Sequence, residues 1–230
     1  IAYTYQQEGH SFYVLTFPSA NATWVYDVST QAWHERAGFD NGSFTRHRSN
    51  CQMAYNSEVV VGDYANGNLY AFDLDVYADN GSVQKWLRSW RALATGQNNL
   101  NRTAHHSLQL DCESGVGLSG PEYSDPTYLI TESGFFITTE SGDFLISYEG
   151  TPTVGVDPKA MLRWSDDGGH TWSNEHWSPM GKIGVYQHRV FWRRLGMTLK
   201  LRDRVYEVSG TDPVKIAIMG AELHLSGTNA

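Results

Sequence analysis

Residues 164–172 read WSDDGGHTW and fit the pattern S-x-D-x-G-x-T-W, which is typical of a tight turn between two β-strands. The Ser165 hydroxyl and the Asp167 carboxylate can bond to N–H groups of such a turn, and Gly169 permits a positive φ. Thr171 completes the pattern, and Trp172 is expected to pack beneath the turn. The stretch therefore predicts a β-hairpin whose five pattern residues have a structural role.

The composition around this turn also favours short strands. The 230 residues include 22 Gly, 8 Trp, 13 Tyr and 9 Phe, which suits many strands joined by tight turns. With 40% hydrophobic and 18% charged residues the chain is not a disordered acidic tail, and no apolar run approaches the roughly 18 residues that span a bilayer. We expect a mainly β protein.

The C-terminal half is predicted to form a β-sandwich over residues 101–230. Strands are expected at residues 104–112, 160–164, 187–195, 204–209 and 214–225, without a convincing amphipathic helix. A strand-rich insertion occupies about 121–156, with short strands at 128–131, 135–139 and 144–148.

The N-terminal part, residues 1–100, contains two similar sets of strands. The first set covers residues 10–17, 22–28 and 32–39, and the second covers 51–55, 59–62 and 68–74. Asp27 and Asp73 occupy matching positions 46 residues apart, a spacing within the range of a propeller blade. We expect partial β-propeller-like blades, an ambiguous but weakly strand-like segment at 83–90, and a linker at 95–101. Because the blades are too few to close and no Met begins the chain, we expect an N-terminal part to be missing.

Charge is unevenly distributed along the chain. The formal net charge of −8 argues against general binding of nucleic acid through phosphate neutralisation. Residues 103–158 hold nine carboxylates and no Lys or Arg, whereas residues 159–207 carry nine basic and five acidic residues. This segregation has two explanations: separate solvated faces, or an electrostatically matched contact between subunits.

Basic and aromatic residues are mixed in residues 189–206. This mixture could pair with phosphates, but strand alternation divides the basic side chains between two faces and disfavours a simple nucleic-acid groove. A subunit contact is the other explanation. The candidate interface residues are Arg189, Trp192, Arg193 and Arg194.

Catalytic and metal-binding patterns are weak. A sialidase-like site needs a Tyr/Glu pair, but Tyr206 and Glu207 are adjacent and would lie on opposite faces of a strand. The same argument separates His105 from His106, and the His170 and His176 pair has no standard ligand spacing. We therefore predict no catalytic residues, no metal and no cofactor.

The turn at 164–172 resembles the Asp box of sialidase propellers and other β-proteins, and the chain as a whole resembles a different family. Residues 160–177, 181–184, 189–196, 203–208 and 212–222, with residues 24–33 and 111–117 upstream, are similar to the C-terminal part of phage packaged-DNA stabilisation proteins. Two segments depart from that likeness: the insertion, at 123–156, and a lengthened turn at 198–201.

This resemblance implies a tail hub or nozzle of a short-tailed phage, attached below the portal and its adaptor. Such a protein assembles in the host cytoplasm as a ring in the virion tail and closes the channel after packaging. It implies other tail proteins and the portal adaptor as partners, passage of DNA without sequence-specific binding, no membrane and no enzymatic activity. The alternative is a carbohydrate-binding or sialidase-like propeller fragment, suggested by the Asp box.

Overall fold

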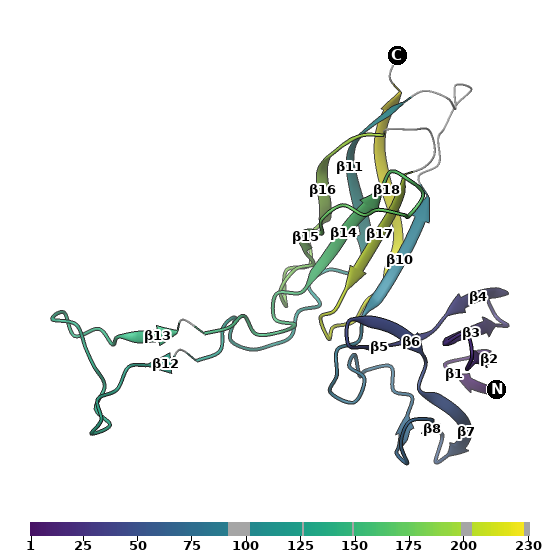
Figure 1. The fold of residues 1–230 in the computed structure, drawn as a ribbon, viewed down its shortest axis with the longest axis horizontal. Helices are drawn as coiled ribbons and strands as arrows, with labels where there is room; N and C mark the ends of the chain where they lie inside the picture. The colour runs from purple at the N-terminus through teal and green to yellow at the C-terminus, as the bar shows by residue number, and fades with distance from the viewer. Residues whose placement is uncertain (92–101, 126, 149, 199–203, 228–230) are drawn as a thin grey trace. The chain divides into compact units, whose positions relative to one another are not determined.

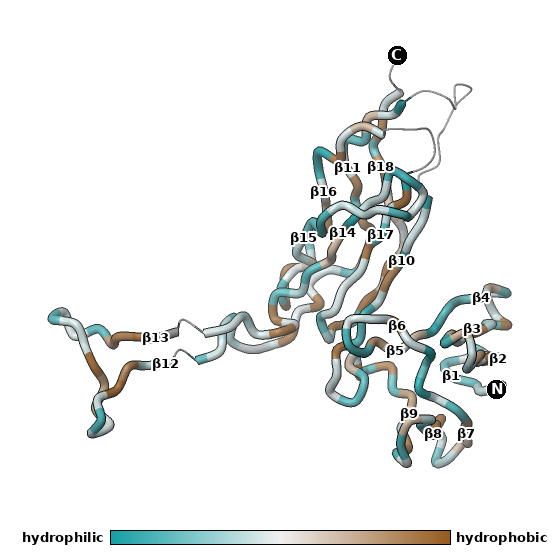
Figure 2. Tube along the Cα trace, viewed as in Figure 1, coloured by the Kyte–Doolittle hydropathy of each residue, from teal (hydrophilic) through white to brown (hydrophobic). Residues whose placement is uncertain are grey.

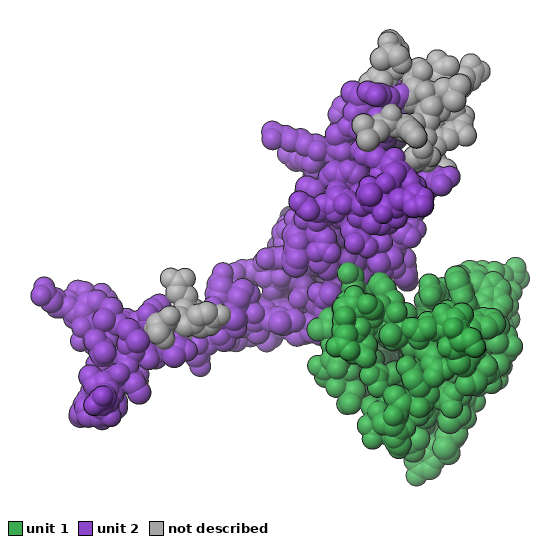
Figure 3. All heavy atoms as spheres, in the orientation of Figure 1, with its two compact units in different colours: residues 1–85 green, residues 86–230 purple. Residues whose placement is uncertain are grey.

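The computed structural model describes residues 1–91, 102–125, 127–148, 150–198 and 204–227, and places them in two compact units. Unit 1 is Ile1–Lys85 and unit 2 is Trp86–Ala230 (Figure 3). All regular elements of these described ranges are β-strands, which confirms the mainly β class. Within the same ranges there is no helix long and apolar enough to cross a bilayer.

The division between the units differs from the boundary expected near residue 100. Strand β10 (Trp86–Arg91) pairs antiparallel with β17 (Val205–Gly210), from Trp86 opposite Gly210 to Arg91 opposite Val205. The ambiguous segment is therefore a strand, and it belongs to the sandwich. The linker expected at 95–101 lies outside the described residues.

Unit 1 consists of small antiparallel sheets with consecutive strand order. The first is β1 (Ala2–Gln7), β2 (His10–Phe17), β3 (Ala22–Asp27) and β4 (Ala32–Glu35). The second is the hairpin of β5 (Ala37–Asp40) and β6 (Ser43–Arg46), so the strand expected at 32–39 is divided between two sheets. The third is β7 (Ser49–Tyr55), β8 (Glu58–Asp63) and β9 (Leu69–Ala71).

The spacing of 46 residues relates the first sheet to the third. Moving β1, β2 and β3 forward by this spacing brings them onto β7, β8 and β9, in the same order and with the same antiparallel neighbours. Val14 and Val25 of the first sheet form one buried cluster with Val59 and Val61 of the third, and Tyr5 joins them. The repeat is thus a structural unit with a shared core, whereas a propeller built from such units stays a prediction.

Unit 2 contains a β-sandwich of two antiparallel sheets (Figure 1). The four-stranded sheet has the order β10-β17-β14-β15, with β14 (Lys159–Ser165) and β15 (His176–Pro179). The three-stranded sheet has the order β16-β11-β18, with β16 (Val190–Met197), β11 (Thr103–Cys112) and β18 (Ile218–Gly227). Between them lie the buried side chains of Leu108, Leu110, Ala160, Leu162, Met180, Val190, Trp192, Leu195, Tyr206 and Val208.

A hydrogen bond crosses this core between the two sheets. His105 Nδ1 of β11 lies 2.6 Å from the Tyr206 hydroxyl of β17, and His105 Nε2 lies 2.9 Å from the Thr103 hydroxyl. Burial, with nearby Arg204, lowers the pKa of His105 to about 4, and burial raises the pKa of Tyr206 to about 12. Both side chains are therefore neutral at pH 7 and satisfy each other inside the core.

Arg204 ties the two sheets together at one end of the sandwich. Its side chain is buried, and its guanidinium donates two hydrogen bonds to Asp166, of 2.5 and 2.7 Å. It also donates to the carbonyls of Leu195 (2.7 Å) and Met197 (3.2 Å) on β16. Because Asp166 follows β14 directly, a single cation connects the four-stranded sheet to the three-stranded one.

Replacing Asp166 by Ala is expected to destabilise unit 2 strongly. The substitution leaves the buried Arg204 without its carboxylate, a change that typically costs about 3–5 kcal/mol. Urea unfolding followed by tryptophan fluorescence measures the loss. Glu222→Ala on β18, where the side chain is exposed, is the matched control and is expected to change stability by less than about 0.5 kcal/mol. A loss for Asp166→Ala no larger than the control would contradict this role.

The insertion at about 121–156 contains less regular strand than expected. Its paired strands are β12 (Thr127–Tyr128) and β13 (Ile146–Tyr148), which lie side by side in Figure 1. The remaining expected strands are reduced to single bridges, Ile130 with Phe136 and Thr138 with Phe144. Turn hydrogen bonds hold much of this segment instead.

Candidate functional site

The Asp-box turn joins β14 to β15 and is held by the side chains of its own pattern. The Asp167 carboxylate accepts hydrogen bonds from the N–H groups of His170 (2.9 Å) and Thr171 (2.8 Å), and from the Thr171 hydroxyl (2.6 Å). The Ser165 hydroxyl donates to Asp167 (2.6 Å) and accepts from the Gly169 N–H (2.8 Å). Gly169 has a φ of +105°, which a side chain would strain.

These bonds fix the protonation state of Asp167. The hydrogen bonds from Ser165 and Thr171 hold the pKa of this carboxylate well below its usual range. Trp172 lies against the guanidinium of Arg163, at 4.7 Å from the ring centroid, and Arg163 forms an ion pair with Glu207. The acceptor positions of the turn are thus engaged by its own backbone and side chains.

Asp167→Ala is expected to lower the stability of the turn, because the N–H groups of two residues and two hydroxyls lose their acceptor. Urea unfolding measures the change, and Glu175→Ala, an exposed carboxylate nearer β15, is the control. A variant that keeps full stability but loses binding to a glycan array would contradict the structural role and support a carbohydrate site.

The candidate interface residues separate into two kinds. Arg189, Arg193 and Arg194 are exposed, and Arg193 lies over the Phe191 ring at 5.0 Å. Trp192 is not a surface residue: it lies in the sandwich core and donates from its indole N–H to the His176 carbonyl at 2.8 Å. It therefore does not belong to an exposed interface.

The strand alternation expected here fails at Arg194. This residue has a φ of +59°, and the pairing of β16 with β11 shifts at the same place, so β16 contains a bulge. After the bulge Leu195 turns into the core with Trp192. The basic side chains of Arg193 and Arg194 both stay on the exterior.

Residues expected to stay apart do so. Tyr206 points into the core towards His105, whereas Glu207 pairs with Arg163 on the other face of the sheet. His105 is buried and the exposed His106 bonds to the Ser226 hydroxyl at 2.8 Å. In the described ranges there is no group of three or more His, Cys, Asp or Glu side chains that could hold a metal ion.

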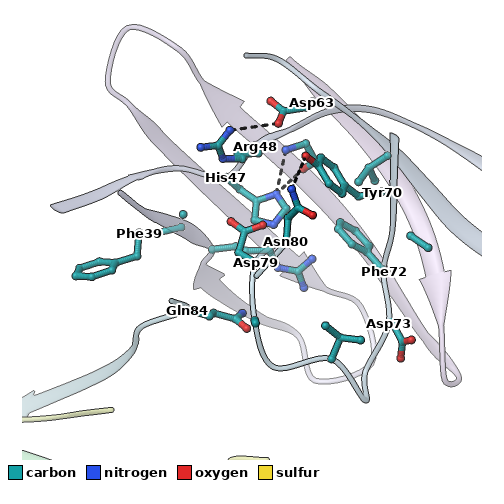
Figure 4. Close-up of a pocket in the computed structure, with 18 of the residues that line it drawn as sticks. Phe39, His47, Arg48, Asp63, Tyr70, Phe72, Asp73, Asp79, Asn80 and Gln84 are labelled. Carbon is teal, nitrogen blue, oxygen red and sulfur yellow. Dashed lines mark hydrogen bonds and ion pairs between the residues drawn. The ribbon is translucent and has the colours of Figure 1, made fainter. Parts of the chain in front are cut away.

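Unit 1 contains a pocket that the sequence did not predict, with a volume of about 460 Å³ (Figure 4). His47 and Arg48, which connect the hairpin β5–β6 to β7, meet Asp63 of β8 and Tyr70 of β9 there. The signal available in the sequence was the junction between the two repeats, where basic residues cluster at 46–48.

The polar side chains of this pocket are bound to one another. Arg48 pairs with Asp63 at 3.3 Å, and the Tyr70 hydroxyl accepts from Asn68 at 3.1 Å. His47 Nδ1 lies 2.6 Å from the Ser49 hydroxyl, and burial lowers the pKa of His47 to about 4. The Ser49 hydroxyl also lies 2.6 Å from the Tyr3 hydroxyl of β1, so it is shared between two side chains. These contacts hold the segment between β6 and β7 against β8.

The neutral state of His105 gives a pH test. Its pKa is about 4 in the fold and about 6.5 in an unfolded chain, so between these values the unfolded state binds the extra proton. Stability conferred by His105 is therefore present above about pH 6.5 and is lost as the pH falls to about 4. His105→Gln is expected to flatten the dependence of the melting temperature on pH in this window. The exposed neighbour His106→Gln should leave the slope as it is, and equal slopes in all three proteins would contradict the assignment.

Residues 137–226 match the β-sandwich family of bacteriophage P22 Gp10. The match confirms the sandwich and the resemblance of the C-terminal portion, and it covers the strands from β13 through β18 almost to their end. No curated protein matches the chain.

Proposed function

We propose that the chain is a structural component of a phage tail hub or nozzle, which assembles as a ring, closes the portal channel and retains packaged DNA. The observation that carries this proposal is the match of residues 137–226 to the P22 Gp10 β-sandwich. The bonding of the Asp box and of the unit 1 pocket supports it too, because their polar side chains serve the framework. The proposed partners are other tail proteins and the portal adaptor.

The mechanism is occlusion. A ring of β units narrows the channel, and a surface of like charge discourages phosphate from sticking during passage of DNA. The carboxylates of residues 103–158, where no Lys or Arg occurs, are the proposed repulsive surface. DNA then passes through without being bound in a sequence-specific way. The protein assembles in the host cytoplasm and acts in the virion tail.

The sialidase-like alternative receives no support from the described residues. Its Asp box is engaged in a turn, and its best Tyr/Glu pair, Tyr206 and Glu207, is divided between the core and the outer face of one sheet. Retaining chemistry of that class needs its nucleophile and acid in a single pocket.

The test is retention of DNA in phage particles. Packaged particles that lack this protein are incubated with the full chain, and nuclease sensitivity of the encapsidated DNA is measured. We expect addition of the chain to make the DNA resistant and the chain to co-sediment with the particles. Asp166→Ala, which is expected to destabilise unit 2 strongly, is the control, and it should protect the DNA less than the unchanged chain does. DNA that stays sensitive while the folded chain is present would overturn the proposal.

A further inference from the structure

The insertion contains an eight-residue repeat that the strand prediction does not explain. Aromatic residues recur at 128, 136 and 144, each followed by a Leu or Ile. The first two repeats continue with Thr131 or Thr139 and then Glu-Ser-Gly at 132–134 and 140–142. We call residues 128–146 the aromatic cap.

Backbone hydrogen bonds close the three repeats into a ring. The Ile137 N–H donates to the Leu129 carbonyl (3.0 Å), and the Leu145 N–H donates to the Ile137 carbonyl (2.8 Å). The Leu129 N–H donates to the Leu145 carbonyl (2.9 Å), which completes the circle. The cap therefore has approximate three-fold symmetry within a single chain.

Side chains support the same symmetry. The rings of Tyr128, Phe136 and Phe144 contact one another edge to face, with centroids 5.2 to 5.6 Å apart. The Thr131 and Thr139 hydroxyls each accept from a backbone N–H four residues later, at 3.1 Å. The cap is thus shaped by its own bonds.

The cap leaves large apolar side chains exposed. Phe135 is 72% exposed, and even the rings of the aromatic triangle are 40% to 55% exposed. In Figure 2 the brown, hydrophobic stretches of this segment lie next to β12 and β13, and its turns are white to teal. The exposed set is Tyr128, Leu129, Ile130, Phe135, Phe136, Phe144, Leu145 and Ile146. Exposed apolar residues gathered in one short segment indicate an interaction surface.

The charge of the aromatic cap limits the kinds of surface that can bind it. The turns of the cap carry Glu132, Glu140 and Asp143, and no Lys or Arg occurs anywhere in residues 103–158. Anionic lipid and DNA would be repelled by such a rim. A fitting partner surface is apolar and basic.

One stretch of unit 2 contains exposed residues of that chemistry. From residue 176 to residue 202 the sequence has no Asp or Glu. In this stretch Trp177, Ile183 and Tyr186 are 57% to 73% exposed, and Arg189 and Arg193 are exposed too. We call residues 177–194, which run from β15 into β16, the basic segment.

We propose that the aromatic cap of one copy docks on the basic segment of a second copy. The two surfaces match in both apolar character and charge, which favours correct pairing over other partners. Because the cap and the basic segment are different surfaces, their contact is head-to-tail, and a head-to-tail contact generates a ring when its rotation closes. The proposal rests on the ring assembly proposed above and assigns the surfaces that form it. Glu132, Glu140 and Asp143 then belong to the subunit contact, and the other carboxylates of residues 103–158 are the ones proposed to face the channel.

Cysteine pairing between two distinguishable copies tests the contact. In a Cys51→Ser, Cys112→Ser background, one copy carries Ser133→Cys in the cap and a larger, tagged copy carries Gln187→Cys in the basic segment. The mixture is oxidised on particles and, separately, as purified chain, and the mixed disulfide is measured on non-reducing gels. Met219→Cys on β18, 73% exposed, replaces Gln187→Cys as the matched control.

We expect several-fold more mixed disulfide for the Ser133/Gln187 pair than for the control, and less in high salt. Phe135→Ser, which lies outside the aromatic triangle, should reduce it several-fold. Arg189→Glu with Arg193→Glu should also reduce it, and Glu132→Lys with Glu140→Lys in the other copy should restore it.

Several results would overturn the contact. The first is a yield of mixed disulfide equal to that of the control. The second is a disulfide that forms only when both cysteines are in the same chain. The third is a chain that forms no mixed disulfide but floats with phosphatidylcholine vesicles, when Phe135→Ser abolishes that flotation. If particles retain DNA but the pair does not cross-link, this contact fails and the hub function stands. If the chain does not join particles, the hub function fails, and the purified chain still decides the contact.

Discussion

The buried ion pair between Arg204 and Asp166 is the contact on which the sandwich depends. Arg204 donates four hydrogen bonds, two to the Asp166 carboxylate and one each to two carbonyls of β16 in the opposite sheet. A charge that would be costly in the core thereby becomes a connection between layers. The His105–Tyr206 hydrogen bond lies in the same sandwich and crosses it between neutral groups. Apolar packing fills the space between the sheets, while these polar contacts fix the position of one sheet relative to the other.

The same use of polar residues recurs in the other sites. Asp167 is engaged in its own turn, Glu207 in a pair with Arg163, and Arg48 in a pair with Asp63. Several side chains that would be catalytic candidates by type are bound to the framework. The described surface also carries exposed apolar groups, and charge is segregated along the sequence.

Charge and exposed apolar residues are distributed in a pattern that suits contact between unlike surfaces. The acidic stretch and the basic stretch are separate along the sequence, and each contains exposed apolar residues in unit 2. An assembly built from head-to-tail contacts requires two unlike surfaces of this kind on each copy. The closed hydrogen bonding of the aromatic cap lets a small, poorly buried segment keep its shape, because its turns and its ring bonds need no support from a larger core.

The sequence by itself determined the β class, the Asp-box turn and the 46-residue spacing of the two sheets of unit 1. These depend on bonds between residues within a few positions, such as Ser165 with Gly169, or on local repetition. Only the tertiary structure decided that Trp86 begins the sandwich, that Arg194 is a bulge and that Trp192 is buried. Each of these depends on a partner far along the chain, as with His105 and Tyr206, which are 101 positions apart. Strand alternation fixes faces only while the register is unbroken, and one extra residue in β16 was enough to change which side chains reach the core.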